Sequence, residues 1–322
     1  MDTNMSERLL AARVRNMRQE AERVLSIELV PADGMHFPSF TPGSHIDVHL
    51  DNGMVRSYSL VNAPDEPGRY VIAVLADAQG RGGSAHVHAA LRCGAELAIS
   101  RPRNHFELEE SAIHSVLIAG GIGITPILCM YRRLRALGRS VELIYAARSR
   151  REAAFLDDLN ALAGDVRLHC DAELGGAKLD MGPILASQPE GTHAYCCGPA
   201  PMLAAFESAC VAACISHVHV ERFQAQAESG TAPVVSYQVE LARSGRSLKV
   251  AAGQSLLDCL LAARVEVDYS CGEGICGACV TRVIDGNVVH CDSVLDEAAR
   301  RRGDSMMVCV SHGAGGRLVL DL

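Results

Sequence analysis

The sequence lacks the features that would assign it to a membrane or to nucleic acid. No apolar run reaches the roughly 20 residues that a membrane-spanning helix needs, and residues 1–24 contain neither an apolar core nor a cleavage site typical of signal peptides. Positive charge is in deficit, with 30 Lys and Arg against 38 Asp and Glu and a formal net charge of -8. These properties predict a cytoplasmic protein that does not bind nucleic acid, and they allow a basic protein partner.

A disulfide framework is also missing. The 13 cysteines are odd in number and scattered along the chain, which indicates a reducing compartment. Six of them lie in apolar patterns and are predicted to pack in the core, where cysteine behaves as a small hydrophobic residue. These six are Cys93, Cys129, Cys170, Cys210, Cys214 and Cys259.

A compact cysteine motif lies near the end of the chain. Cys271, Cys276 and Cys279 follow C-x4-C-x2-C spacing in a glycine-rich loop, and Cys309 comes about thirty residues later. This is the plant-type spacing for a [2Fe–2S] cluster. The alternative is a zinc site, although zinc ribbons usually pair two short knuckles. Cys291 has the wrong spacing for the fourth ligand.

With 322 residues the chain is expected to form two or three domains of about 100 to 150 residues each. Residues 23–75 read as short alternating strands, which predicts an antiparallel β-barrel or sandwich. One of these strands carries Arg56-Ser57-Tyr58-Ser59, with Arg56 and Tyr58 on one face.

Glycines follow at residues 80–83 and precede a helical stretch, with Ser84 predicted as its N-cap. Such a turn can bind a phosphate through backbone N–H groups and the helix dipole. A simple loop with a helix cap is the alternative.

From residue 115 apolar strands alternate with helices, which predicts an α/β domain with a parallel sheet. Gly121, Gly123 and Thr125 lie in the turn between its first strand and first helix, where such sheets bind a dinucleotide. The turn differs from the standard Rossmann fingerprint. Cys197-Gly198-Pro199 forms a second strand-to-helix turn that is expected on the same edge of the sheet.

Residues 224–234 are small and polar and read as a linker. A hairpin, a helix, the cysteine loop and a closing strand follow, which together predict a compact α+β unit.

In this order, the three blocks resemble the phthalate dioxygenase reductase family, the single-chain reductases of bacterial Rieske oxygenases. The resemblance rests on RSYS, GRGGS, GGIGITP, YCCGP, ERF, CGEGICGAC and MVCVS taken together. It implies an FMN-binding barrel at 1–110, an NAD-binding domain at 111–225, a linker at 226–234 and a plant-type ferredoxin domain at 235–322.

The family's function would make this chain an oxidoreductase, and a monomer is expected. It would pass electrons from NADH through FMN and a [2Fe–2S] cluster to a terminal Rieske-type aromatic-ring oxygenase or demethylase. Two alternatives stay open: a reductase that serves a haem or diiron protein, and a carrier or redox sensor that uses the ferredoxin part alone.

The resemblance also implies roles for individual residues. Ser59 would lie near the flavin N5 that receives hydride, and Cys197 beside the nicotinamide; these two are the predicted catalytic residues. Phe223 would cover the flavin, although plain packing is the alternative. The remaining predicted flavin and nucleotide residues are Arg56, Ser57, Tyr58, Gly82, Gly83, Ser84, Gly121, Gly123, Thr125, Arg148 and Gly198. The predicted cluster ligands are Cys271, Cys276, Cys279 and Cys309.

One stretch departs from the pattern of some NADH-using relatives. Residues 147–151 read Ala-Arg-Ser-Arg-Arg, where those relatives have an Asp. An acid there would bind the ribose 2′-OH, whereas Arg148 and its neighbours would accept a 2′-phosphate. NADPH is therefore possible beside NADH, unless these arginines only form a solvated helix start.

Overall fold

A computed structural model describes residues 9–66, 68–78, 80–162, 164–224 and 233–322. The chain divides into two compact units, Met1–Glu221 and Arg222–Leu322. The first unit contains both the predicted barrel and the predicted nucleotide domain. Most of the predicted linker 226–234 lies outside the described residues, so the linker and the domain limits stay predictions.

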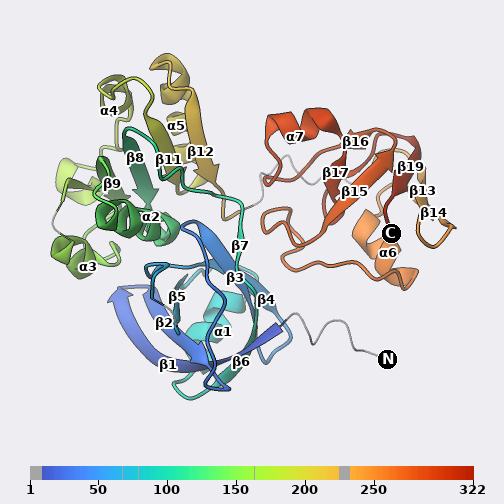
Figure 1. Cartoon of the computed structure of the whole chain (residues 1–322), viewed down its shortest axis with the longest axis horizontal. Coiled ribbons are helices and arrows are strands. Elements are labelled where there is room, and N and C mark those ends of the chain that lie inside the picture. Colours follow the sequence, from blue (N-terminus) through green and yellow to red (C-terminus); the bar gives the residue numbers. More distant parts are fainter. Residues whose placement is uncertain (1–8, 67, 79, 163, 225–232) are drawn as a thin grey trace. The chain divides into compact units, whose positions relative to one another are not determined.

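The barrel is a seven-stranded antiparallel sheet in the order β4-β3-β6-β1-β2-β5, with β7 paired to β3. The first and last strands of this order, β4 and β5, also lie against each other, so the sheet curves into a barrel (Figure 1). Alternating side chains such as Ile27, Leu29, Ile46 and Ile72 fill its interior. The elements are β1 (Leu9–Ala21), β2 (Val24–Pro31), β3 (Ser44–His49), β4 (Val55–Ser59), β5 (Tyr70–Leu75), α1 (Gly83–Ala90), β6 (Glu96–Ser100) and β7 (Arg103–Asn104).

The second half of this unit is a five-stranded parallel sheet in the order β10-β9-β8-β11-β12. The strand order reverses between β8 and β11, and ligands bind at the carboxyl edge of such a switch point. The strands are β8 (Ser115–Gly120), β9 (Val141–Ala147), β10 (Val166–Cys170), β11 (His193–Cys197) and β12 (His217–Glu221). The helices are η1 (Gly121–Gly123), α2 (Ile124–Ala136), α3 (Leu156–Ala161), η2 (Asp171–Leu174), α4 (Gly182–Ala186) and α5 (Ala200–Ala212).

The second unit is a mixed sheet in the order β14-β13-β19-β15-β17, beside a small two-stranded sheet of β16 and β18. β13 and β14 form the predicted hairpin, and β19 pairs parallel to β13. The elements are β13 (Tyr237–Leu241), β14 (Arg246–Val250), α6 (Leu256–Ala262), β15 (Val280–Asp285), β16 (Val288–Val289), α7 (Glu297–Arg302), β17 (Ser305–Met307), β18 (His312–Gly313) and β19 (Gly316–Leu320). The three predicted fold classes are thus all present.

Two local predictions are wrong. The N-cap of α1 is Gly82, at a φ of 84°, and not Ser84. A left-handed φ favours glycine, and the Ser84 hydroxyl instead accepts a hydrogen bond from the Asp77 N–H at 3.1 Å. Cys93 and Cys214, predicted as core residues, are exposed, whereas the other four are buried. The apolar pattern predicted burial for these two cysteines, but each lies just beyond a helix, Cys93 in the turn after α1 and Cys214 in the turn after α5.

Candidate flavin, nucleotide and iron–sulfur sites

The RSYS strand, β4, brings Arg56 to the glycine turn that opens α1. A guanidinium N–H of Arg56 donates to the Arg81 carbonyl at 3.2 Å. A Cβ on Gly83 would lie only 2.6 Å from Arg56 Nε, so glycine is required for this approach. A cationic side chain therefore lies beside a helix N-terminus with a glycine-lined surface, which is a combination that suits a phosphate. The residues present fit the phosphate group of FMN.

Tyr58 and Ser57 lie on opposite faces of β4. Tyr58 packs against the barrel core, and burial raises the pKa of its phenol to about 12, so it stays neutral. The Ser57 hydroxyl donates to Asp47 Oδ1 at 2.6 Å, and Asp47 also accepts from Arg103 at 2.5 Å. The structure therefore places Ser57 in a polar network on the outer face of the strand.

The two glycine turns of the parallel sheet touch each other. Ala119 of β8 is paired with Cys197 of β11, so both turns leave the same sheet edge. A Cβ on Gly123 would lie 2.1 Å from the Cys197 carbonyl oxygen, and one on Gly198 would lie 3.2 Å from Gly120 Cα. Only glycines allow these two turns to pack so closely, and together they form one surface at the switch point.

The Thr125 hydroxyl bonds to the backbone of its own turn. It is buried, and its Oγ1 donates to the Ile122 carbonyl at 3.0 Å. The structure brings Gly121, Gly123 and Thr125 into one turn, where Thr125 holds the shape of that turn. A role for Thr125 toward a nucleotide stays a prediction.

Ser59 and Cys197, predicted from different blocks, meet at Glu221. Glu221 ends β12 directly opposite Cys197, and Cys197 Sγ lies 4.0 Å from Glu221 Oε2. The Ser59 side chain hydrogen-bonds to the same carboxyl. Burial raises the pKa of Glu221 to about 8, although the Ser59 hydrogen bond opposes the shift. Burial, with Glu221 nearby, also holds the pKa of the Cys197 thiol well above its ordinary value.

Sequence reasoning missed Glu221. Its only signal in the sequence is its place as the first letter of ERF. Phe223 belongs to the second unit and is half-buried, and its predicted place over the flavin stays a prediction.

Arg148 is exposed just after β9, and its neighbour Arg150 is held by a carboxylate from η2, which follows the next strand, β10. Arg150 Nε donates to Glu173 Oε1 at 2.7 Å, and the Ala172 N–H donates to the Arg148 carbonyl at 3.0 Å. The turns that follow β9 and β10 are therefore tied together. Because α3 begins at Leu156, Arg148 and Arg150 lie in a turn and not in a helix start.

The four predicted cluster ligands gather as two pairs of sulfur atoms in the second unit. Cys279 Sγ lies 3.1 Å from Cys309 Sγ. The thiols of Cys271 and Cys276 hydrogen-bond to each other. The Cys271 N–H points at Cys276 Sγ at 3.5 Å, and the Glu273 N–H points at Cys271 Sγ at 3.3 Å. Three of the four residues are buried, and Cys309 is half-buried.

In each pair the hydrogen bond between the two thiols lowers the pKa of one, Cys271 or Cys279, and raises the pKa of the other, Cys276 or Cys309, so each pair contains one thiol that ionises readily. The hydrogen bond from Cys276 lowers the pKa of Cys271 to about 6, assisted by the backbone N–H groups of Glu273, Ile275 and Cys276. The hydrogen bond from Cys309 likewise lowers the pKa of Cys279. Thiolates are the form that binds iron.

The donor set of two thiol pairs fits a two-iron cluster, which these four residues would hold. Among the described residues, no three His, Cys, Asp or Glu side chains converge as the ligands of a single metal ion. Cys291 lies apart from the pairs: its N–H donates to Ser311 Oγ at 3.1 Å and its thiol faces the Val289 carbonyl.

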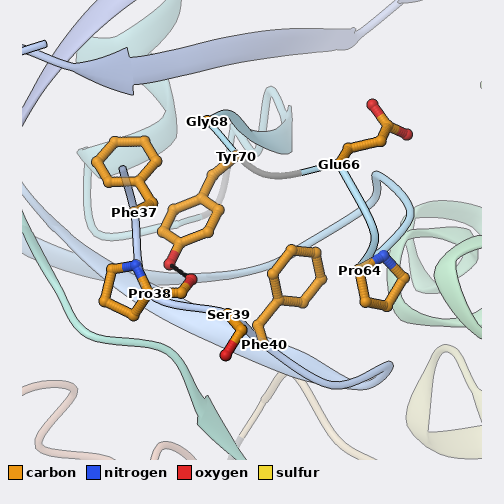
Figure 2. A pocket seen from close by; sticks show the side chains of 8 residues that line it. All are labelled: Phe37, Pro38, Ser39, Phe40, Pro64, Glu66, Gly68 and Tyr70. Atoms are coloured by element: carbon orange, nitrogen blue, oxygen red, sulfur yellow. Dashed lines mark hydrogen bonds between the residues drawn. The ribbon is translucent and has the colours of Figure 1, made fainter. Parts of the chain in front are cut away.

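A small cavity elsewhere in the barrel contains none of the predicted site residues. Figure 2 shows the Tyr70 ring beside Phe37 and Phe40, with the Tyr70 hydroxyl donating to the Pro38 carbonyl. The Phe37 and Tyr70 rings stack with centroids 4.3 Å apart. The cavity is thus walled by aromatic packing between two barrel loops.

Comparisons with known proteins agree with this arrangement. Residues 239–312 match the family model for the 2Fe-2S iron-sulfur cluster binding domain. The phenoxybenzoate dioxygenase subunit beta of Ectopseudomonas oleovorans is 46% identical over 315 residues, which are 97% of this chain and 97% of that protein.

Several solved structures are similar over 98% of this chain, and two of them are described here. One is phthalate dioxygenase reductase, described as a modular structure for electron transfer from pyridine nucleotides to [2Fe–2S]; it is 36% identical, with a TM-score of 0.72 and 99% of its chain covered. The other is an intact type IV self-sufficient cytochrome P450 monooxygenase, which is 37% identical, with a TM-score of 0.89 and 41% of its chain covered.

The fold and the thiol pairs define an iron–sulfur flavoprotein reductase. Within that class, the chain belongs to the phthalate dioxygenase reductase family. The predicted family, fold class, enzyme class and cofactors, namely FMN, the [2Fe–2S] cluster and NADH, are confirmed. The roles of individual residues stay predictions.

Among the helices of the described part, none is long and apolar enough to cross a membrane.

Proposed function

We propose that this chain takes electrons from NADH and delivers them, one at a time, to a terminal Rieske-type oxygenase or demethylase. The observation that carries the proposal is the continuous likeness, over 97% of both chains, to a subunit named for a dioxygenase. A reductase that keeps the flavin, nucleotide and ferredoxin parts in one chain needs no separate ferredoxin to reach its acceptor.

The order of the parts follows from electron counting. A flavin accepts a two-electron hydride and releases single electrons, which a [2Fe–2S] centre requires. The residues of this chain bind and orient. Arg56 and Gly83 would hold the phosphate, and the surface around Cys197 and Gly198 would position the nicotinamide.

The protonation of Glu221 and Cys197 suits this role. Because the pKa of Glu221 is raised to about 8, its carboxyl holds a proton at neutral pH and stays hydrogen-bonded to Ser59. The raised pKa of Cys197 keeps it a neutral thiol, so it would act as a wall of the site and not as a nucleophile. Neither of these two groups would then bring a negative charge toward the hydride at neutral pH.

The proposal is tested by coupling the purified protein to purified acceptors. Without oxygen, an equimolar amount of NADH should bleach the visible absorbance of the protein, and adding an oxidised Rieske oxygenase should restore the colour. Admitting oxygen with the substrate of that oxygenase and further NADH should then start turnover. Bleaching with no transfer to any Rieske oxygenase would contradict the proposed acceptor. A protein that neither NADH nor NADPH bleaches would be a carrier or sensor.

A haem protein is the second candidate acceptor. It is favoured by the likeness to a self-sufficient P450, in which a segment similar to this chain makes up 41% of the polypeptide. A cross-assay with a haem monooxygenase and a Rieske oxygenase at equal concentrations separates the two acceptors.

We further propose a cytoplasmic monomer without affinity for nucleic acid. The 13 cysteines suit a reducing compartment, and the net charge of -8 repels phosphate backbones. Size-exclusion chromatography with light scattering tests the monomer directly.

A further inference from the structure

We propose that Glu173 selects NADH over NADPH by occupying Arg150, the arginine that would otherwise bind a 2′-phosphate. The inference rests on the proposed use of a nicotinamide nucleotide and names the residue that decides which one is accepted. The sequence alone shows only arginines after β9 and no acid in that stretch. The structure supplies the acid from η2, which follows the neighbouring strand β10.

The position of the adenosine ribose follows from the sheet. In doubly wound sheets, the group that recognises the ribose lies at the end of the second strand, about 20 residues after the glycine turn. Here the second strand is β9, and the residues just beyond it include Arg148 and Arg150. Because β10 is the neighbour of β9, the turn η2 after β10 opens on the same edge. Glu173 lies in that turn.

The side chains are joined across the two turns. Arg150 Nε lies 2.7 Å from Glu173 Oε1, and Arg150 Nη2 lies 3.4 Å from Glu173 Oε2, so the two groups face each other as a fork. The backbone bond from Ala172 N–H to the Arg148 carbonyl holds the turns together. The second acid of η2, Asp171, is paired with Lys178 at 2.5 Å. Each acid of this turn therefore holds one cation.

The Arg150–Glu173 pair changes the charge that a nucleotide would meet at its adenosine ribose. A 2′-phosphate brings nearly two negative charges at neutral pH and needs a guanidinium whose N–H groups can turn to it. With Arg150 facing Glu173, a 2′-phosphate would meet a carboxylate beside that arginine. A ribose 2′-OH is neutral and can donate to a carboxylate such as Glu173. The arrangement therefore favours NADH.

The test separates binding from turnover. The variants are Glu173→Gln, Arg150→Gln and the double variant in the full-length holoprotein. The probes are 2′,5′-ADP, which carries the 2′-phosphate, and 5′-ADP, which does not, both measured by calorimetry. The matched control is Glu240→Gln, which breaks an exposed Arg–Glu pair of the same 2.7 Å geometry on the ferredoxin unit.

We expect Glu173→Gln to bind 2′,5′-ADP about tenfold more tightly, which corresponds to one additional charge-assisted contact. Binding of 5′-ADP should change less than about twofold on that reasoning. The double variant should lose the gain, because the released arginine is gone. The ratio of kcat/KM for NADPH to that for NADH, with ferricyanide as acceptor, should rise in parallel.

An unchanged affinity of Glu173→Gln for 2′,5′-ADP would overturn the inference, as would a gain that persists in the double variant or appears in Glu240→Gln. Failure of the proposed function is a separate result: the unaltered protein would then not be bleached by NADH or NADPH, whatever the two ADP probes show.

Discussion

Cys279 and Cys309 are separated by 30 positions in the sequence, yet their sulfur atoms lie 3.1 Å apart. Cys279 ends the cysteine loop just before β15, and Cys309 follows β17, which pairs antiparallel with β15. The strand pairing therefore brings the distant fourth cysteine to the loop.

This pairing predicts different effects of two neighbouring cysteines on the cluster. Cys309→Ser should remove most of the iron and of the cluster absorbance, because one thiol pair is broken. Cys291→Ser should retain both, since the Cys291 thiol faces the Val289 carbonyl instead. Iron analysis and visible spectra of both variants make the comparison. Equal loss in the two would contradict Cys309 as the fourth ligand.

A site residue can be predicted from the sequence when the residues that it acts with lie close to it in the chain. The cluster ligands are recognisable because three of them lie within nine residues and their spacing is set by the loop itself. Glu221 is not, because its contact with Cys197 depends on the register between β11 and β12, which no short motif encodes. The pair of Glu173 and Arg150 depends in the same way on the order of β9 and β10 in the sheet.

Backbone conformation is a second reason why some predictions from the sequence are wrong. Ser84 has a side chain suited to an N-cap, but the left-handed φ of Gly82 gives the cap position to the glycine. The propensity of serine for N-cap positions does not fix the backbone conformation, and here the left-handed φ at Gly82 decides where α1 begins.

Ser59 is expected to act on the rate of flavin reduction. Ser59→Ala removes one oriented hydrogen bond, worth about 1.4 kcal/mol, so hydride transfer should slow about tenfold. Stopped-flow absorbance with excess NADH measures the rate, and the flavin content of the variant is the control. An unchanged rate with flavin fully bound would remove Ser59 from the mechanism.

Glu221 should give the same step a pH dependence. Its pKa is raised to about 8, so the carboxyl is neutral below pH 8 and becomes a buried anion above it. With Ser59 at its predicted place near the flavin N5, this anion would lie close to the hydride acceptor and would cost on the order of 1 kcal/mol or more, so flavin reduction should slow about fivefold or more above pH 8. Glu221→Gln, which stays neutral, should lose this pH step. A step that persists in the variant would assign it to another group.

The same raised pKa has a consequence for stability. The folded state holds the Glu221 proton more tightly than the unfolded chain, so this group's contribution is full below the unfolded pKa near 4.5 and is lost as the pH rises through about 8. Relative to the unaltered protein, Glu221→Gln should therefore gain free energy of unfolding between pH 5 and pH 9. Urea unfolding of both proteins at the two pH values measures the difference, which should be absent if the carboxyl titrates normally.

Gly83 should control FMN binding through Arg56. A Cβ at Gly83 would lie 2.6 Å from Arg56 Nε, so Gly83→Ala must displace the guanidinium. Loss of one charge-assisted contact should weaken FMN binding about tenfold. Fluorescence titration of the apoprotein with FMN measures the affinity. Gly182→Ala is the control, since its new Cβ would approach only the flexible Asp180 side chain, at 3.3 Å.

The division of the chain into two compact units predicts that it can be cut between them. The pieces 1–226 and 231–322 should each fold with their own cofactor, because each contains a complete buried core. The first piece should still oxidise NADH with ferricyanide, a small acceptor that reaches the flavin directly. Transfer to an oxygenase should collapse at micromolar protein, since the tether no longer keeps the ferredoxin at a millimolar effective concentration.

Adding the ferredoxin piece in excess should restore part of that transfer, and the recovery should follow its concentration. The matched control is the same excess of a ferredoxin piece carrying Cys309→Ser, which should restore nothing because one thiol pair is broken. If the first piece alone supported oxygenase turnover at the parent rate, electrons would be leaving from the flavin, and the order of flavin, cluster and acceptor would be wrong.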